Sequence, residues 1–131
     1  MTEAKQEMKI GDEMEDGTIL AGYYEGKPLY TTLKDAPGVY TFSQAASYAE
    51  NLDGNGHHDF HAPSKGELNV LYENRHKGKL KGTFNETGSY PAAWYWSSSQ
   101  VDGGYASDQR FSDGTQSVDV KYDGSSLRCV R

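Results

Sequence analysis

The sequence predicts an α+β domain in which two helices come early and several short antiparallel strands come late. Three observations lead to this class. Two amphipathic segments with helix-capping residues lie between residues 41 and 75, β-favouring runs separated by turn residues follow residue 90, and strands do not alternate with helices as a parallel sheet requires. The chain of 131 residues has the length of a single domain.

The first elements are a leader and a hairpin. Residues 1–16 are mostly polar and charged, so we expect a flexible or partly ordered leader ahead of one domain formed by residues 17–131. Residues 18–23 and 28–32 are β-favouring runs, and the residues between them, 24–27, include Gly26. This pattern predicts a β-hairpin.

Two helices follow the hairpin. The first is predicted over residues 42–52, where apolar side chains recur at helical spacing, with Thr41 or Ser43 as its N-cap. The second is predicted over residues 64–75 and begins at a capping box formed by Ser64 and Glu67. The basic residues from Arg75 to Lys81 come next and indicate a solvated loop.

The C-terminal third has the composition of short strands and turns. Strands are predicted at residues 94–99, 109–111, 116–122 and 126–131, with a hairpin turn at Asp113-Gly114. Alternation places Trp94 and Trp96 on one face of their strand and Tyr95 on the other, so at least one of these sets belongs to the core. The residues expected to be mostly buried are Trp94, Trp96, Phe111, Leu127 and Val130.

Composition excludes several classes of protein. The net charge of −6 argues against nonspecific nucleic-acid binding, because affinity for phosphates comes from clustered Lys and Arg. No apolar stretch approaches the length of a membrane span, and the N-terminus lacks a signal-peptide pattern, so we expect a cytoplasmic protein or one carried in a phage particle. The single Cys129 excludes an intramolecular disulfide, and its position beside Val130 indicates a buried thiol.

The sequence provides no metal or catalytic motif. His57 and His58 are adjacent in a Gly-rich turn, so at most one of them could converge with His61 on a metal. Residues 53–56 begin like a calcium loop, but His58 replaces the required Gly and Lys65 the required Glu. No nucleophile elbow is present. We therefore expect no metal, no cofactor and no enzymatic activity.

Four stretches carry a family resemblance. Residues 60–68 (FHAPSKGEL), 94–99 (WYWSSS), 109–114 (QRFSDG) and 127–131 (LRCVR) occur in this order. Together they resemble the C-type-lectin-like fold of the formylglycine-generating-enzyme branch, and in particular the variable proteins of diversity-generating retroelements. The family has Trp and Arg where this chain has Phe60 and His61, so we expect local repacking ahead of the second helix.

The resemblance implies a non-enzymatic protein whose C-terminal face is diversified by a retroelement. In that family a reverse transcriptase randomises template adenines, mostly in AAC-type codons, which cannot then encode Trp, Met, Lys, Gln or Glu. Between residues 101 and 124 the only such residues are Gln109, Gln116 and Lys121, each in a framework-like stretch. The predicted ligand-binding residues are Val101, Asp102, Gly103, Gly104, Tyr105, Ser107, Asp108, Thr115, Ser117, Val118, Asp119, Val120, Tyr122, Asp123 and Gly124.

The expected partner is a protein or another macromolecule, and the sequence leaves homo-oligomerisation open. Tyr among Gly, Ser and Asp is the chemistry of antibody paratopes, in which rigid rings lie among small polar groups. A structural or receptor-binding domain of a phage or surface assembly is the alternative. Enzymes of the related branch hold copper with a pair of cysteines, and this chain has one. The Glu-Pro-Asn and Trp-Asn-Asp triplets of calcium-dependent lectins are absent.

Overall fold

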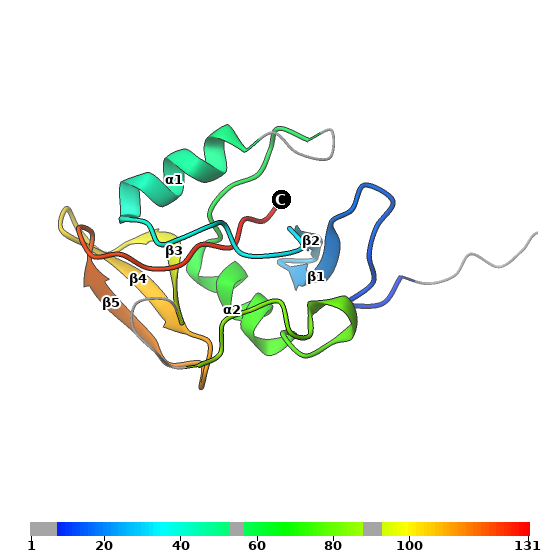
Figure 1. Ribbon diagram of the computed structural model, residues 1–131. Coiled ribbons are helices and arrows are strands. Elements are labelled where there is room, and N and C mark those ends of the chain that lie inside the picture. Colours follow the sequence, from blue (N-terminus) through cyan, green and yellow to red (C-terminus); the bar gives the residue numbers. More distant parts are fainter. Residues whose placement is uncertain (1–7, 53–56, 88–92) are drawn as a thin grey trace, which may run out of the picture.

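The computed structural model describes residues 8–52, 57–87 and 93–131, and they form two antiparallel sheets and two α-helices (Figure 1). Strands β1 (Ile19–Tyr24) and β2 (Lys27–Thr31) make one sheet, and β3 (Trp94–Gln100), β4 (Tyr105–Arg110) and β5 (Gln116–Val120) make the other, in the order β3-β4-β5. Helix α1 (Phe42–Asn51) contacts β3, whereas α2 (Lys65–Glu73) contacts β1, β3 and β4. The α+β prediction is confirmed.

Both helices begin at capping boxes. Thr41, not Ser43, caps α1: its hydroxyl accepts a hydrogen bond from the Gln44 backbone amide, and the Gln44 side chain accepts one from the Thr41 amide. Ser64 and Glu67 make the same reciprocal pair at α2, as the sequence indicated. Each box satisfies backbone donors that a helix start otherwise leaves without a partner.

The first hairpin turns over two residues in the left-handed region. Glu25 has φ 52° and Gly26 has φ 80°, and β1 and β2 pair on either side from Tyr24 with Lys27. Positive φ at both central residues matches the right-handed twist of the flanking strands, which explains why a two-residue loop suffices.

The core has two parts, one on each face of β3. Tyr95 packs against Phe111 at a ring-centroid distance of 4.4 Å, in a cluster with β1 and α2. Trp96 points to the other face and packs edge-on against Phe42 at 5.7 Å, in a cluster with α1. Both rings are 0% exposed because β3 is covered on both faces. Trp94, the first residue of β3, was predicted to be mostly buried but is only half-buried.

The C-terminal segment differs from the predicted closing strand. Residues 125–130 are all buried instead of alternating, and the segment forms only isolated bridges, to Tyr40, Tyr95, Thr31 and His61 in turn. In Figure 1 it crosses the middle of the molecule between the two sheets. A segment enclosed on both sides buries successive side chains, which removes the period of two that a half-exposed strand shows.

Arg128 holds this segment in place. Its guanidinium is 0% exposed, donates to Asp35 Oδ1 (3.0 Å) and the Thr32 carbonyl (3.1 Å), and lies 4.0 Å from the centre of the Phe84 ring. Burial raises the pKa of Asp35, although the charge of Arg128 opposes the shift. The neighbouring Cys129 is 1% exposed, and burial raises the pKa of its thiol to about 12, so it carries almost no thiolate at neutral pH.

The leader predicted for residues 1–16 is described only in its second half. Residues 1–7 lie outside the described residues. Gly11 donates its amide to the Leu20 carbonyl (2.8 Å), and Leu20 donates to the Asp12 carbonyl (2.9 Å), so residues 11–12 lie against β1. Among the described residues no helix has both the length and the apolar character needed to cross a membrane.

Candidate ligand-binding face

The candidate site is built on the β4–β5 hairpin and the two connections at one end of the three-stranded sheet (Figure 1, left). The loop of residues 101–104 joins β3 to β4, and the turn of residues 121–124 follows β5. They lie side by side because the Lys121 amide donates to the Gly104 carbonyl at 3.0 Å. We call residues 101–105 and 115–124 the hairpin face.

A single carboxylate shapes the loop of residues 101–104. Asp102 Oδ1 accepts hydrogen bonds from the backbone amides of Gly104 (2.8 Å) and Tyr105 (3.0 Å), and the Val101 amide donates to the Tyr105 carbonyl (2.9 Å). These local bonds satisfy the backbone without help from the core. The loop therefore presents Val101, which is 57% exposed, to solvent.

Large apolar side chains gather on the hairpin face. Eight are exposed among the described residues, and four belong to this face: Val101 (57%), Tyr105 (46%), Val118 (51%) and Tyr122 (87%). Tyr105 lies opposite Val120 in the ladder, so the two side chains share one side of the sheet. Apolar groups concentrated on one surface are typical of an interaction site.

Two predicted site residues are not on this surface. Ser107 is 6% exposed and Asp108 is 3% exposed, because they lie in the middle of the central strand β4, where larger neighbouring side chains cover them. The Ser107 carbonyl accepts a bond from the Ser97 hydroxyl (2.7 Å), and Asp108 lies opposite Trp96. Their expected exposure is therefore wrong. Asp119, Val120 and Gly124 are half-buried, whereas the other ten predicted residues are exposed: Val101, Asp102, Gly103, Gly104, Tyr105, Thr115, Ser117, Val118, Tyr122 and Asp123.

The framework-like residues between them hold the hairpin. Gln109 Nε2 donates to Asn69 Oδ1 of α2 (2.9 Å) and to the Gly114 carbonyl (3.2 Å). Arg110 makes a two-point ion pair with Asp113 (3.0 and 2.6 Å). Gly114 has φ 82°, and a Cβ there would lie 2.6 Å from the Tyr72 ring. These contacts fix the turn without using the exposed side chains.

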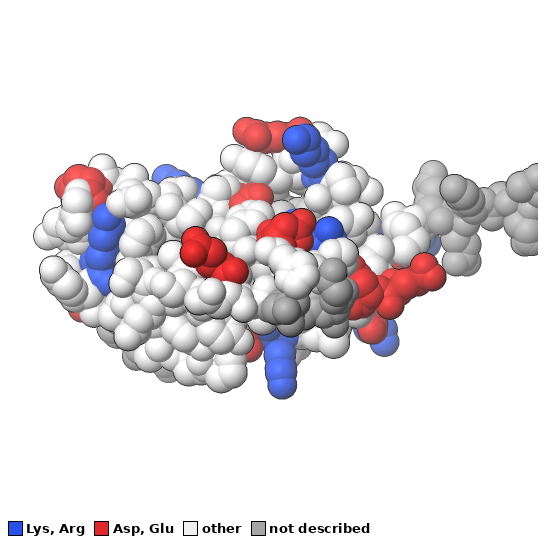
Figure 2. All heavy atoms as spheres, turned by 90° about the horizontal axis from the view of Figure 1, so that it is seen from above, with Lys and Arg blue, Asp and Glu red and all other residues white. Residues whose placement is uncertain are grey.

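The hairpin face is acidic. Burial, and next the charges of Asp119 and Asp123, raise the pKa of Asp108 to about 7, and burial followed by Asp123 raises the pKa of Asp119. The nearest cation, Lys121, donates to Gln100 Oε1 and lies 5.0 Å from the centre of the Phe42 ring. In Figure 2 the end of the molecule that carries this sheet is mostly uncharged and shows a small acidic patch with a Lys or Arg side chain close to it.

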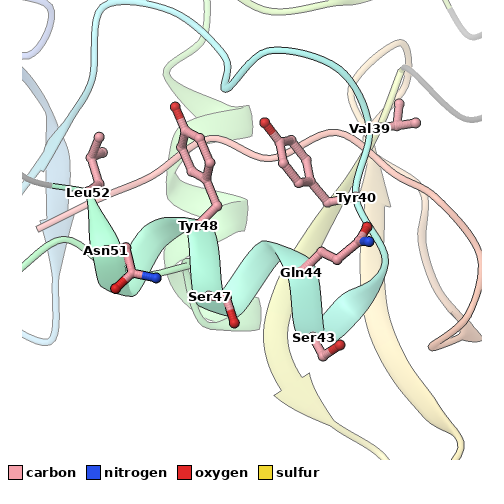
Figure 3. A pocket seen from close by; sticks show the side chains of 8 residues that line it. All are labelled: Val39, Tyr40, Ser43, Gln44, Ser47, Tyr48, Asn51 and Leu52. Carbon is pink, nitrogen blue, oxygen red and sulfur yellow. The ribbon is translucent and has the colours of Figure 1, made fainter.

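One neighbouring feature was not predicted from the sequence. An open groove of about 790 Å³ runs along the outer side of α1. Figure 3 shows Tyr40 and Tyr48 standing on the same side of the groove, with Val39 at its end. A Cβ placed on Gly124 would lie 3.3 Å from Val39 Cγ2, so the groove adjoins the hairpin face. Its lining residues all come from the contiguous stretch 39–52, in which no known binding motif occurs.

The histidines make other contacts. His57 Nε2 lies 2.6 Å from Asp16 Oδ2, and His61 Nε2 lies 3.2 Å from Glu67 Oε1, whose hydrogen bond raises the pKa of His61. Residues 53–56, which begin like a calcium loop in the sequence, lie outside the described residues. Across the described ranges no group of three or more His, Cys, Asp or Glu side chains is arranged to hold a metal ion.

The architecture defines the class of protein. Its described residues form an α+β domain with two helices and five short antiparallel strands, consistent with the C-type-lectin-like fold, and the edge strand β5 is largely exposed. The sequence model of the Lcl C-terminal domain matches residues 16–131, most of the chain, so the chain belongs to that family. No curated protein matches the chain.

Proposed function

We propose that this chain is a non-enzymatic binding domain, that its hairpin face contacts protein ligands, and that a retroelement diversifies this face. Four of the eight exposed large apolar side chains among the described residues, Val101, Tyr105, Val118 and Tyr122, belong to the hairpin face, and this concentration carries the proposal. Exposed Val and Tyr side chains contribute little to folding, but they become favourable contacts when a partner covers them.

The residue types support a surface that can change. Apart from Gln116 and Lys121, the hairpin face consists of Gly, Ser, Asp, Thr, Val and Tyr, all of which are reachable from AAC-type codons. Gln109, Phe111 and Lys121, which hold the hairpin through side-chain contacts, lie outside the predicted set of variable positions. Two predicted exposed positions do make contacts: the Asp102 carboxylate shapes its loop, and the Thr115 hydroxyl accepts a long bond from Arg110 (3.4 Å). Substitution at the other predicted exposed positions leaves the framework contacts in place.

The absence of an activity is part of the proposal. Copper-dependent oxidation of the related enzymes needs two cysteines, whereas the only thiol here, Cys129, is buried and has a raised pKa. Asp108 has a raised pKa of about 7, as a general base would, but it is buried opposite Trp96. A buried carboxyl group does not reach a substrate at the surface.

Two experiments test the proposal. A display library that randomises the exposed predicted positions of the hairpin face is expected to stay folded and to yield binders against unrelated proteins. A matched library that randomises exposed positions of α1 and β2 is the control, and equal yields from both would contradict the assignment of the face. The genome supplies the second test: a reverse transcriptase gene and a near-repeat of the 3′ end of this gene are expected nearby, and their absence would contradict diversification.

A further inference from the structure

Strand β5 forms an edge of its sheet, and the ladder register shows which of its backbone groups point outward. Gln116, Val118 and Val120 lie opposite Gln109, Ser107 and Tyr105. The next pair beyond each end of this set is hydrogen-bonded: the Lys121 amide donates to the Gly104 carbonyl, and the Arg110 amide donates to the Thr115 carbonyl. Bonded and non-bonded pairs alternate in an antiparallel ladder, so the N–H and C=O groups of Gln116, Val118 and Val120 point away from β4.

Only one end of this edge is closed by the chain itself. The Val120 amide donates to Asp119 Oδ1 (2.8 Å), and the Val120 carbonyl accepts from the Asp123 amide (2.9 Å). At Val118 the carbonyl has only a long contact from the Ser117 hydroxyl (3.4 Å). Within the described ranges no backbone hydrogen bond reaches Gln116 or Val118 from this side. As far as the described residues go, two successive outward positions are thus open to a further strand.

The composition of β5 does not protect the edge in the usual way. Exposed edges commonly carry Lys, Pro or a bulge that prevents pairing with another chain. The strand reads Gln-Ser-Val-Asp-Val, has no register shift against β4, and exposes 51% of Val118. An extended peptide that adds to such an edge gains backbone hydrogen bonds and can pack an apolar side chain on Val118.

Charge decides which strand fits. Asp119 lies in β5 and Asp123 in the turn after it, and the buried Asp108 of the neighbouring strand has an Oδ1 without a hydrogen-bond partner. Arg110 is paired with Asp113, and Lys121, whose amine donates to the neutral Gln100, is a single positive charge among these carboxyl groups. A second copy of this chain would bring a second acidic cluster to the same place, which is repulsive. A cationic segment compensates the carboxylates instead.

We propose that the free edge of β5 accepts an extended, Lys- or Arg-bearing segment of a protein ligand as a fourth strand of the sheet. The inference rests on the proposed function of the hairpin face and specifies how one part of that face works. Gln116 and Val118 make the backbone bonds, Val118 provides the apolar contact, and Asp119 with Asp123 faces the cationic side chains.

The test uses random peptides displayed on phage and selected on the immobilised full chain. Enriched peptides are expected to be basic and of β-favouring sequence. Val118→Pro is the diagnostic variant, because an edge strand tolerates Pro where its N–H faces solvent, while the donor for the added strand is lost. We expect it to keep the melting temperature of the parent and to bind the enriched peptides about tenfold or more weakly.

Charge and exchange measurements complete the test. The double variant Asp119→Asn with Asp123→Asn is expected to lose the preference for basic peptides, whereas the control Glu25→Gln with Glu50→Gln, exposed elsewhere, keeps it. Bound peptide is expected to slow amide hydrogen exchange at Gln116 and Val118. If binding falls with Tyr122→Ala but not with Val118→Pro, the face binds and the edge inference is wrong. If neither variant weakens binding, the proposed function of the face is wrong too.

Discussion

Two residues of the same strand show how the domain separates folding from recognition. Gln109 of β4 is 1% exposed and bonded both to α2 and to the Gly114 turn. Tyr105, four positions earlier on the same side of the strand, is 46% exposed and lies opposite Val120. Both take part in the ladder through their backbones. The strand therefore needs its backbone bonds and a few anchoring side chains, and the remaining side chains are free to differ.

The contrast extends to the two ends of the sheet. At the turn of residues 111–115, Phe111 is buried, and Arg110 and Asp113 form an ion pair. At the opposite end, the loop of residues 101–104 is held by Asp102 and its own backbone. An end that is tied to the core cannot vary without cost, whereas a loop that satisfies its backbone locally can vary at the positions that do not hold it, which here excludes Asp102. This difference makes the second end the better place for a changing surface.

The largest expected effect comes from removing core rings. Trp96→Ala and Phe111→Ala should each lower the free energy of unfolding by about 3–5 kcal/mol, because both rings are 0% exposed and a cavity would remain. Denaturant unfolding measures the loss, with Tyr122→Ala as the exposed aromatic control. If the core variants are as stable as this control, the assignment of residues to the framework and to the face is wrong.

Gly114→Ala should have the next largest effect. The residue has φ 82°, and the new methyl group would lie 2.6 Å from the Tyr72 ring, so strain and a clash act together. We expect a loss of about 1–3 kcal/mol in the free energy of unfolding. Gly103→Ala is the matched control, since nothing lies within 4 Å of the added methyl group. Equal effects of the two substitutions would contradict a structural role for the turn.

Much of this fold could be predicted from the sequence because its signals are local. Ser64 and Glu67 mark the start of α2, and Asp113-Gly114 marks the last hairpin, since capping and turn geometry depend on residues close in the chain. The Thr41 cap needed the structure, because Ser43 has the same chemistry. The prediction of a strand at residues 126–131 was wrong, because the continuous burial of this segment depends on both halves of the core packing around it.

The candidate face was predicted less completely. Residue type indicated exposure correctly for Tyr105 and Tyr122, but the same reasoning failed for Ser107 and Asp108. Small polar residues suit a loop surface and also suit the centre of a sheet when their neighbours are bulky. Only the strand order β3-β4-β5, which sequence periodicity does not determine, shows that β4 is enclosed at both edges.

Asp108 gives a pH-dependent test of its buried position. Burial, with Asp119 and Asp123 next, raises its pKa from 3.8 to about 7, so between these values the folded chain holds a proton that the unfolded chain has lost. Its contribution to stability therefore falls as pH rises through that window. Asp108→Asn cannot ionise. The melting temperature of the variant minus that of the parent should increase between pH 4 and pH 7 and then level off. A difference that is constant with pH would contradict the buried, ionisable position.

The smallest effect is expected on the hairpin face itself, although the most residues change there. Tyr105, Thr115, Ser117, Val118 and Tyr122 are all exposed, and the framework contact of Thr115 is a long one, from Arg110 Nη2 to its hydroxyl (3.4 Å). Replacing them together with Ala should change the free energy of unfolding by no more than about 0.5 kcal/mol per site, as surface substitutions usually do.

That small change in stability is the strictest test of the contrast between framework and face, because the same five substitutions should abolish binding of peptides selected on the parent chain. Stability is measured by denaturant unfolding and binding by titration, both on one preparation of each variant. The matched control replaces five exposed residues outside the hairpin face, Tyr23, Lys27, Lys34, Ser47 and Glu50, with Ala. If the face variant unfolds while this control does not, the exposed side chains stabilise the hairpin and the surface is not free to vary. If both stay folded and both bind, recognition lies elsewhere on the molecule. We expect the face variant to keep its stability and lose binding, and the control variant to keep both. That result is required if the framework and the face are separate.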